Sequence, residues 1–331
     1  MELENQTRFP AGLFRSVVDD NRFAAAVVAR VAFDLTAARP NPAEEQPWIV
    51  SAAPWKNEYG QMDGDEVFYR GGVDIFLFGK AWAPGRAVTE STVVVEVEKF
   101  RRQALVIGDR AWVRRVRGGM APTAPKPFES VPLTLAHAFG GKDKWDGLDI
   151  PYPDNPEGRG YATEEKNAEG KLLPNLEDPQ RRIARWDDRP DPVGFGMCPM
   201  TCGLRLRNGI VLDDKKQIRD LKPTLFNSAF PAMIAERVVA GDPVRVSGVS
   251  KTGKPLLFQI PSLDLMVRLR FGNEIIERPL VIDQVGIESE RNRFFITYRY
   301  PFRYVMYPLQ KRSCELLMAP AAVSSREARK G

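Results

Sequence analysis

The chain of 331 residues carries a single histidine, so a Ser-His-Asp or Cys-His catalytic arrangement must use it or be absent. This histidine, His137, stands in the stretch LTLAHAFGG, and no G-x-S-x-G elbow occurs in the chain. We interpret His137 as a structural residue that orders the loop before Gly140 and Gly141. The sequence therefore points away from an enzyme that works by nucleophilic catalysis.

The three cysteines suggest a second kind of chemistry. Cys198 and Cys202, four positions apart in CPMTC, would form a four-ligand zinc set together with Cys314 and His137. Zinc knuckles normally use closer cysteine pairs on both sides, and here the other two candidates are isolated and distant in sequence. We therefore expect a buried or loop-borne cysteine pair and no cofactor. A zinc-stabilised structural module is kept as an alternative.

Acidic residues crowd the stretch after the histidine, which raises calcium binding and acid–base catalysis as hypotheses. The spacing of an EF-hand loop fails, because lysines and a proline occupy positions around Gly147 that should carry carboxylates. A carboxylate pair for glycoside hydrolysis leaves no local signature in a sequence, so a glycan-processing enzyme is the alternative function. The acidic residues are Asp143, Asp146, Asp149, Asp154 and Glu157.

Phosphate-binding loops are not indicated. Two G-x-G patterns occur, at residues 158–160 and 194–196, but Thr163 and Pro199 stand where the third glycine should be. The chain contains no Walker sequence, so we do not expect work driven by ATP. We interpret these glycines as turn residues.

The stretch YRYPFRY, residues 298–304, alternates aromatic and basic side chains. Its aromatic residues, which include Tyr298 and Tyr300, share one strand face, as in a base-stacking platform, and its arginines lie on the other. We favour a strand whose aromatic face meets the core or a partner while the arginines point into solvent. The reason is that the rest of the chain lacks a basic groove.

Composition and charge limit the function further. The chain has 48 basic and 43 acidic residues, and its basic clusters are short and scattered, so we expect no nucleic-acid partner. Charges interrupt every apolar run well before the ~20 residues that a bilayer-spanning helix needs, so we expect no membrane insertion. The first residues show no secretory signal and the few cysteines fit a reducing compartment, which predicts a cytoplasmic protein.

Strand patterns dominate the chain and predict a mainly β fold. We expect antiparallel sheets, in a sandwich or barrel-like arrangement, with two related halves as one option, and few short helices, near residues 133–139 and 231–240. Two hairpins are expected, one across Gly108-Asp109-Arg110 and one across residues 288–292. The expected strands are 23–35, 73–78, 92–100, 104–107, 111–116, 235–239, 243–249, 256–260, 263–271, 280–287 and 293–300.

The middle of the chain is different. Proline and glycine are dense from about residue 122 to residue 199, and periodicity disappears there, so a long irregular segment is expected. The predicted organisation is one integrated unit with four parts. These are an N-terminal β region (1–125), a loop-rich motif segment (126–200), a C-terminal β region (201–310) and a tail (311–331).

The order of the loop motifs is the most specific feature of the chain. In chain order the motifs are FDL (33–35), GDR-W (108–112), PF-PL-AFGG (127–141), NPEGRG (155–160), LPNLEDP (173–179) and GFG (194–196). This order resembles the bacterial family of type VI secretion adaptors that was first catalogued as a domain of unknown function, and the likeness covers about residues 20 to 305.

The resemblance implies a cytoplasmic adaptor, or chaperone, without catalytic residues. Such a protein binds a toxic effector, often one with a PAAR-like spike-tip domain, and helps to mount it on the VgrG spike. Recognition usually lies in loops carried on a rigid sheet, so we expect the partner surface to combine residues 127–199 with an exposed sheet edge. The expected partner-binding residues are His137, Phe139, Asn155, Arg159, Tyr161, Asn175, Glu177, Asp178, Phe195, Tyr298 and Tyr300.

Overall fold

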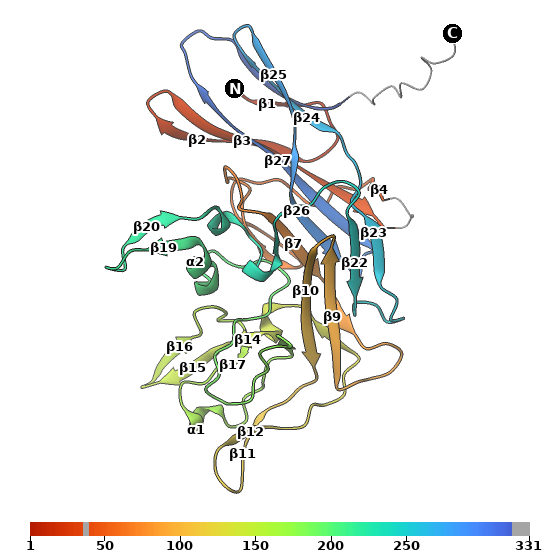
Figure 1. Cartoon of the computed structure of the whole chain (residues 1–331), viewed down its shortest axis with the longest axis vertical. Helices are drawn as coiled ribbons and strands as arrows, with labels where there is room; N and C mark the ends of the chain where they lie inside the picture. Colours follow the sequence, from red (N-terminus) through yellow and green to blue (C-terminus); the bar gives the residue numbers. More distant parts are fainter. Residues whose placement is uncertain (36–39, 320–331) are drawn as a thin grey trace.

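The structure, a computed structural model, describes residues 1–35 and 40–319. The molecule is elongated, and its larger sheets follow one another along the long axis above a loop-rich end (Figure 1). The mainly β fold is confirmed, and the larger sheets are mostly antiparallel. Among the described residues each sheet has two free edges, so there is no closed barrel.

The central sheet has seven strands and is built around two long ones. These two, β3 and β27, pair antiparallel along their whole length, and the segment of β3 from Ala25 to Phe33 is buried on both faces. The predicted hairpin of β26 with β27 is confirmed, and β26 pairs with β7 in parallel. The strands are β2 (Ala11–Asp19), β3 (Arg22–Asp34), β4 (Asn41–Pro42), β7 (Val73–Phe78), β21 (Ile234–Ala235), β26 (Val281–Glu288) and β27 (Arg293–Val305).

The second sheet has five antiparallel strands and packs onto the same core. Its strand β9 shows the predicted alternation, because Val93, Val95 and Val97 are buried while the intervening side chains are partly exposed. This pattern confirms that one face of the sheet meets the core. The strands, in spatial order, are β18 (Leu176–Glu177), β10 (Phe100–Ile107), β9 (Glu90–Val97), β22 (Pro243–Ser247) and β23 (Leu256–Gln259).

The third sheet corrects the predicted tail. Residues 312–318 form a strand, β28, which pairs antiparallel with β24 and parallel with β1. The alternating apolar residues of CELLM explain this, since Cys314 and Leu316 are fully buried. Residues 320–331 of the expected tail lie outside the described residues. The strands are β1 (Leu3–Asn5), β28 (Arg312–Met318), β24 (Leu265–Phe271) and β25 (Glu274–Pro279).

The loop-rich segment is mostly irregular, as predicted, but its Phe139, Tyr152 and Leu173 form a small separate core together with Trp112. Only short strand pairs and helical turns interrupt it (Figure 1). These elements are β13 (Ser130–Pro132), η1 (Leu135–His137), β14 (Phe139–Gly140), β15 (Lys142–Trp145), β16 (Leu148–Pro151), β17 (Arg159–Gly160) and α1 (Glu165–Ala168). Three short strands precede the segment in the sequence: β8 (Lys80–Trp82), which pairs with β13, and β11 (Trp112–Arg114) and β12 (Met120–Pro122), which pair with each other.

The remaining short elements lie on either side of this segment in the sequence. The strand pair β19 with β20 stands off the body of the molecule (Figure 1). They are β5 (Trp55–Asn57), β6 (Gly60–Met62), α2 (Gly203–Gly209), β19 (Ile210–Leu212), β20 (Ile218–Leu221), η2 (Pro223–Phe226) and η3 (Pro231–Met233).

The hairpin predicted across Gly108-Asp109-Arg110 is wrong. Strand β10 folds back onto β9 through a tight turn in which Glu98 has a positive φ of 50°, and β11 pairs with β12 instead. Gly108 is needed for a close approach, because a Cβ there would lie 1.7 Å from the carbonyl oxygen of Lys126. The glycine therefore marks a crossing of two segments, not a hairpin turn.

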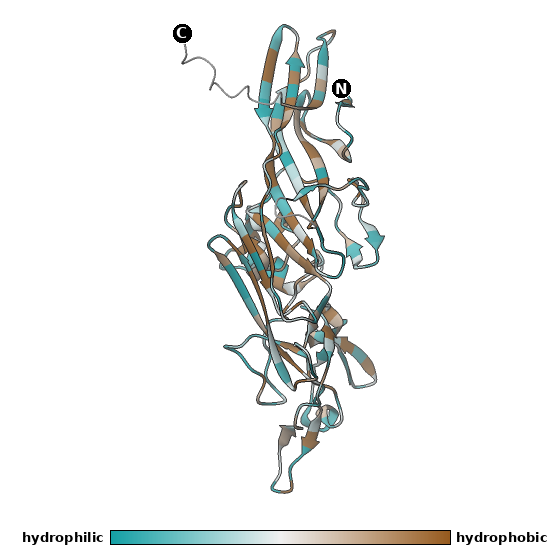
Figure 2. Cartoon of the chain, turned by 90° about the vertical axis from the view of Figure 1, so that its right-hand side faces the viewer, coloured by the Kyte–Doolittle hydropathy of each residue, from teal (hydrophilic) through white to brown (hydrophobic). Residues whose placement is uncertain are grey.

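Three further predicted elements were too long. The helix expected at residues 133–139 is the single turn η1, and the helix expected at 231–240 is the single turn η3 followed by the two-residue strand β21. The strand expected at 235–239 likewise includes only Ala235. Figure 2 shows apolar and polar residues alternating along the outer strands, as half-buried strands require.

Candidate functional site

The predicted loop motifs meet at His137 and Asn175. The backbone N–H of Asn175 donates to the carbonyl of His137 at 2.9 Å, and His137 Nδ1 donates to Asn175 Oδ1 at 2.8 Å. The Asn175 amide also donates to the carbonyl of Ile107 at 2.8 Å and to Asp109 Oδ1 at 3.0 Å. The AFGG, LPNLEDP and GDR motifs are thus tied together by one buried side chain.

Burial lowers the pKa of His137 below its ordinary value, and the nearby Arg159 guanidinium lowers it further, while the bond to Asn175 opposes them. The imidazole is therefore neutral at physiological pH. A neutral ring with Nδ1 committed to Asn175 is suited to holding two loops in register.

A second buried amide, Asn155, holds the NPEGRG motif against the AFGG motif. The Asn155 Nδ2 donates to the backbone carbonyls of Leu135 at 2.8 Å and Phe139 at 3.0 Å. The backbone carbonyl of Asn155 accepts a hydrogen bond from the N–H of Gly141. Gly140 has a φ of +147°, and a Cβ there would lie 2.0 Å from the Asn155 carbonyl oxygen. Only glycine fits this contact.

The GDR, AFGG, NPEGRG and LPNLEDP motifs together form what we call the loop cluster. Charged residues stabilise the rest of this cluster. Arg110 of the GDR motif pairs with Glu177 of the LPNLEDP motif at 2.5 Å, and both side chains are buried. Asp143, in the acidic stretch, accepts hydrogen bonds from Thr163 and Asn167 and pairs with Lys171. Burial raises the pKa of Asp143, but these bonds outweigh burial and hold the pKa well below its usual range.

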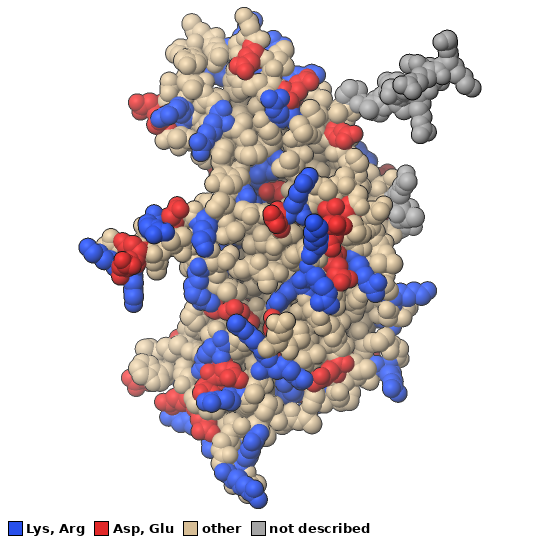
Figure 3. Space-filling view, viewed as in Figure 1, with Lys and Arg blue, Asp and Glu red and all other residues tan. Residues whose placement is uncertain are grey.

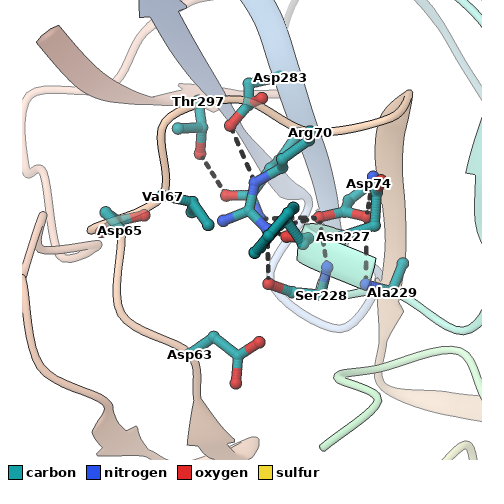
Figure 4. A network of polar contacts seen from close by, with 12 residues as sticks. Asp63, Asp65, Val67, Arg70, Asp74, Asn227, Ser228, Ala229, Asp283 and Thr297 are labelled. Carbon is teal, nitrogen blue, oxygen red and sulfur yellow. Dashed lines mark hydrogen bonds and ion pairs between the residues drawn. The ribbon is translucent and has the colours of Figure 1, made fainter. Parts of the chain in front are cut away.

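A buried ion network, which the sequence analysis missed, lies under the central sheet (Figure 4). Arg70 pairs with Asp283 at 3.1 Å and with Asp74 at 3.5 Å, and it donates to Ser228 Oγ at 2.8 Å. Asp74 also accepts hydrogen bonds from the side chain of Asn227 and from two backbone N–H groups. These contacts join β7 and β26 to the segment after η2.

The network continues across β3 and β27. Arg299 donates to Asp283 at 2.9 Å, and Arg30 pairs with Asp65 at 2.6 Å and donates to Thr297 at 2.9 Å. Its ionised members are three arginines and three aspartates, so the network is charge-balanced. A signal was present in the sequence, because Arg30 and Asp74 interrupt otherwise apolar strands, and a charge in a buried strand needs a partner.

A known protein family matches most of the chain. Residues 20–299 match a family described as an uncharacterized protein conserved in bacteria, DUF2169. The chain belongs to this family. No curated protein and no solved structure matches the chain. No helix in the described part of this DUF2169 protein is long and apolar enough to cross a membrane.

The eleven residues expected to contact a partner do not form one surface in this DUF2169 protein. Eight lie in or beside the loop cluster, Phe195 packs in the main core next to β7, and Tyr298 and Tyr300 lie in β27 of the central sheet. Six are buried, and their side chains pack within the protein's own loops and core. The buried residues are Phe139, Asn155, Asn175, Glu177, Phe195 and Tyr298.

The other five predicted residues are at least partly accessible, and most are engaged within the chain. Arg159 donates from Nε to the carbonyl of Ala136 at 2.9 Å, and Asp178 pairs with Arg102 at 3.1 Å. The Arg189 guanidinium lies over the Tyr161 ring at 5.1 Å. His137 and Tyr300 are half-buried. A partner could reach these residues, but only alongside contacts that they already make.

The aromatic stripe of β27 belongs to the core. Phe302 and Tyr304 are buried like Tyr298, and Tyr304 stacks on Phe23 with ring centroids 5.3 Å apart. The prediction that the arginines of this strand point into solvent is wrong for Arg299, which is 2% exposed. Its ion pair with Asp283 explains this burial, and the two residues could not be paired from the sequence alone.

A cavity of about 790 Å³ lies beside the buried ion network. Tyr298 and Arg299 both line it, and two of their polar atoms, Tyr298 OH and Arg299 Nη2, are buried without a hydrogen-bond partner in the described chain. Such atoms are rare in folded proteins. The segments that line the cavity include residues 69–73, 236–240, 261–266, 279–283 and 298–301.

The cysteines are buried free thiols. A hydrogen bond from Cys198, assisted by the N–H groups of Leu204 and Arg205, lowers the pKa of Cys202 to about 7 although burial opposes this. Within the described ranges no group of three or more metal-ligating side chains comes together. The zinc set that His137 and Cys314 would complete therefore does not form there.

Proposed function

We propose that this chain is a non-catalytic adaptor, or chaperone, that binds a type VI secretion effector in the cytoplasm and promotes its loading onto the VgrG spike. The effector class it fits best carries a PAAR-like domain. The motif order and the membership of an uncharacterized bacterial family are the starting point for this proposal. The main observation in support of the adaptor proposal is the distribution of exposed apolar residues.

Two hairpins expose large apolar side chains to solvent. In the hairpin β15–β16, the cross-strand pair Trp145 and Leu148 is 58% and 64% exposed, and in β19–β20 Ile218 is 65% exposed. Both hairpins project on the left-hand side of the molecule in Figure 1. Scattered apolar residues on a surface are normal, but grouped ones on projecting elements are typical of protein-binding sites.

The base of this surface is held rigidly. The bonds of Asn155 and Asn175 fix the loops from which β15–β16 projects, and Asp154 pairs with Arg207 of α2, just before β19, at 2.8 Å. A surface that is ordered before binding loses less conformational entropy when the partner arrives. This rigidity supports a role in recognition.

The charges on the visible face support a protein partner over a nucleic acid. Figure 3 shows lysines and arginines mixed with aspartates and glutamates, without a wide patch of either sign. A nucleic-acid groove would concentrate basic side chains. The glycan-processing alternative has less support, because Asp143 is committed to Lys171 and to neighbouring hydrogen-bond donors, and Asp154 is committed to Arg207.

Affinity measurements on hairpin variants test the proposal. A purified type VI effector that carries a PAAR-like domain should bind the wild type, and Trp145→Glu combined with Ile218→Glu should weaken binding at least roughly tenfold. The matched control combines Tyr307→Glu with Ile275→Glu, at residues of similar exposure elsewhere. The proposal is overturned if the wild type does not bind, and the hairpin surface is wrong if both variants bind equally.

A further inference from the structure

The strand β26 has an open edge where the cavity begins. It pairs with β7 only from Gln284 onward, so in the described chain residues 281–283 have no strand neighbour on that side. A β-bulge falls at the same place, because the register with β27 shifts between Ile282 and Gln284 and leaves Asp283 unpaired in the ladder. Bulges often occur next to functional sites, where they redirect a side chain.

The wall of the cavity is mostly apolar and its charges cancel. Three basic residues and three acidic ones line it. Three of these six, Arg70, Arg299 and Asp283, are already engaged in the buried ion network. Val281 at the mouth is 60% exposed. A strongly charged ligand would find no complementary field there, whereas an uncharged, largely apolar one would.

Two buried polar atoms offer hydrogen bonds that the protein does not use. Arg299 Nη2 can only donate, and Tyr298 OH can donate or accept. The two residues are 2% and 3% exposed, and both line the cavity. A ligand that brings a carbonyl oxygen would satisfy the arginine donor, and a backbone amide carries both a carbonyl and an N–H.

We propose that this cavity, with the free edge of residues 281–283, receives an extended and largely apolar segment of the effector's polypeptide, which adds a strand to β26. The inference rests on the proposed adaptor function and names the contact through which the effector is held. Backbone pairing along β26 supplies affinity, and the apolar wall selects the side chains. The volume lies within the range of about 300–1,000 Å³ common for binding sites, enough for a short segment.

The first test uses a lysine at the strand edge. Val281→Lys places a charge where a partner strand would pair, a device by which natural sheet edges avoid pairing, and it should weaken effector binding at least roughly tenfold. Val17→Lys is the matched control, because Val17 is 69% exposed on the edge strand β2. Equal affinities of Val281→Lys and the wild type would overturn the proposal.

The second test removes a single unused hydroxyl. Tyr298→Phe should leave the denaturation midpoint unchanged or slightly raised, because the hydroxyl has no partner in the protein, and should weaken effector binding roughly three- to tenfold. In the control Tyr59→Phe the lost hydroxyl donates to Glu288 at 2.8 Å, so stability should fall while affinity stays the same. A Tyr298→Phe variant that binds as tightly as the wild type would contradict the proposed contact.

A third test does not depend on the effector. Short random peptides displayed on phage are selected against the wild type and counter-selected against Val281→Lys. Enrichment of apolar peptides supports a peptide-binding groove even if the effector does not bind, in which case only the adaptor function fails. If the effector binds Val281→Lys as tightly as the wild type and no peptide is enriched, the proposed strand contact is overturned, whereas the adaptor function is not. Binding of small apolar dyes in the cavity without binding of any peptide also overturns the proposed strand contact.

Discussion

His137 and Asn175 are joined twice, once through the imidazole and the side-chain amide and once through their backbones, at 2.8 and 2.9 Å. The only histidine of the chain is thus a connector between two loops. The residues that give the loop segment its recognisable motifs are, to a large extent, the ones that hold it in shape.

Replacing His137 by alanine should destabilise the protein by about 1–3 kcal/mol, because the oxygen of the buried Asn175 side chain would lose its donor. The denaturant midpoint at neutral pH measures this change. A smaller effect, close to that of an exposed surface substitution, would show that the connection contributes little to folding.

Stability should also fall as the pH drops from about 7 to about 5.5. The pKa of His137 is lowered in the folded protein, so below its ordinary value of 6.5 the unfolded chain binds a proton that the folded chain does not. His137→Gln should flatten this dependence, and denaturant titrations at several pH values would reveal it. A slope that persists in the variant would have to come from another group.

Gly140→Ala should prevent normal folding of the loop segment. The added Cβ would lie 2.0 Å from the Asn155 carbonyl oxygen, and the backbone φ of +147° is unfavourable for any other residue. Gly147→Ala is the control, since it has a positive φ but nothing within 4 Å of the new Cβ. Hydrogen exchange of the loop amides should rise sharply in the first variant and only slightly in the second.

Breaking the buried ion network should be costly. Arg70→Met leaves Asp74 and Asp283 without their shared cation, and removal of one partner of a buried pair typically costs about 3–5 kcal/mol. Arg101→Met removes an exposed ion pair with Glu96 and should cost less than about 1 kcal/mol. Thermal unfolding of the two variants compares them directly, and equal losses would refute the importance of the network.

Glu288 should make the protein sensitive to acid. Burial raises the pKa of this carboxyl, but bonds from Arg293, Trp48 and Tyr59 outweigh burial and leave the pKa below the ordinary value of 4.5. Its contribution to stability is therefore present above about pH 4.5 and is lost as the pH falls through the folded-state pKa. Glu288→Gln should lower the midpoint at pH 7 and reduce the loss between pH 5 and pH 3.

Much of the sheet framework could be predicted from the sequence. The strand β7 matches its predicted bounds, because six consecutive apolar or partnered residues end at a glycine. The β26–β27 hairpin was predictable since two apolar runs flank a polar turn. The mistaken hairpin after β10 shows the limit, because Gly108 signals a tight approach whose partner, Lys126, lies far along the chain.

The functional residues were harder to predict, because their contact partners also lie far from them in the sequence. Asn155 and Asn175 are polar residues in distinctive loop motifs, which fits either binding to a partner or bonding to the protein's own carbonyls. Only the three-dimensional structure shows which carbonyls surround them. Arg299 and Asp283 likewise pair across neighbouring strands, and their shared burial depends on a bulge that the sequence does not reveal.

The most direct measurement is size-exclusion chromatography of this protein mixed with a purified type VI effector that carries a PAAR-like domain, the partner that we propose. We predict one complex that elutes ahead of either protein alone and that contains both. Separate elution of the two proteins, at concentrations well above roughly 1 μM, would contradict the proposed adaptor function.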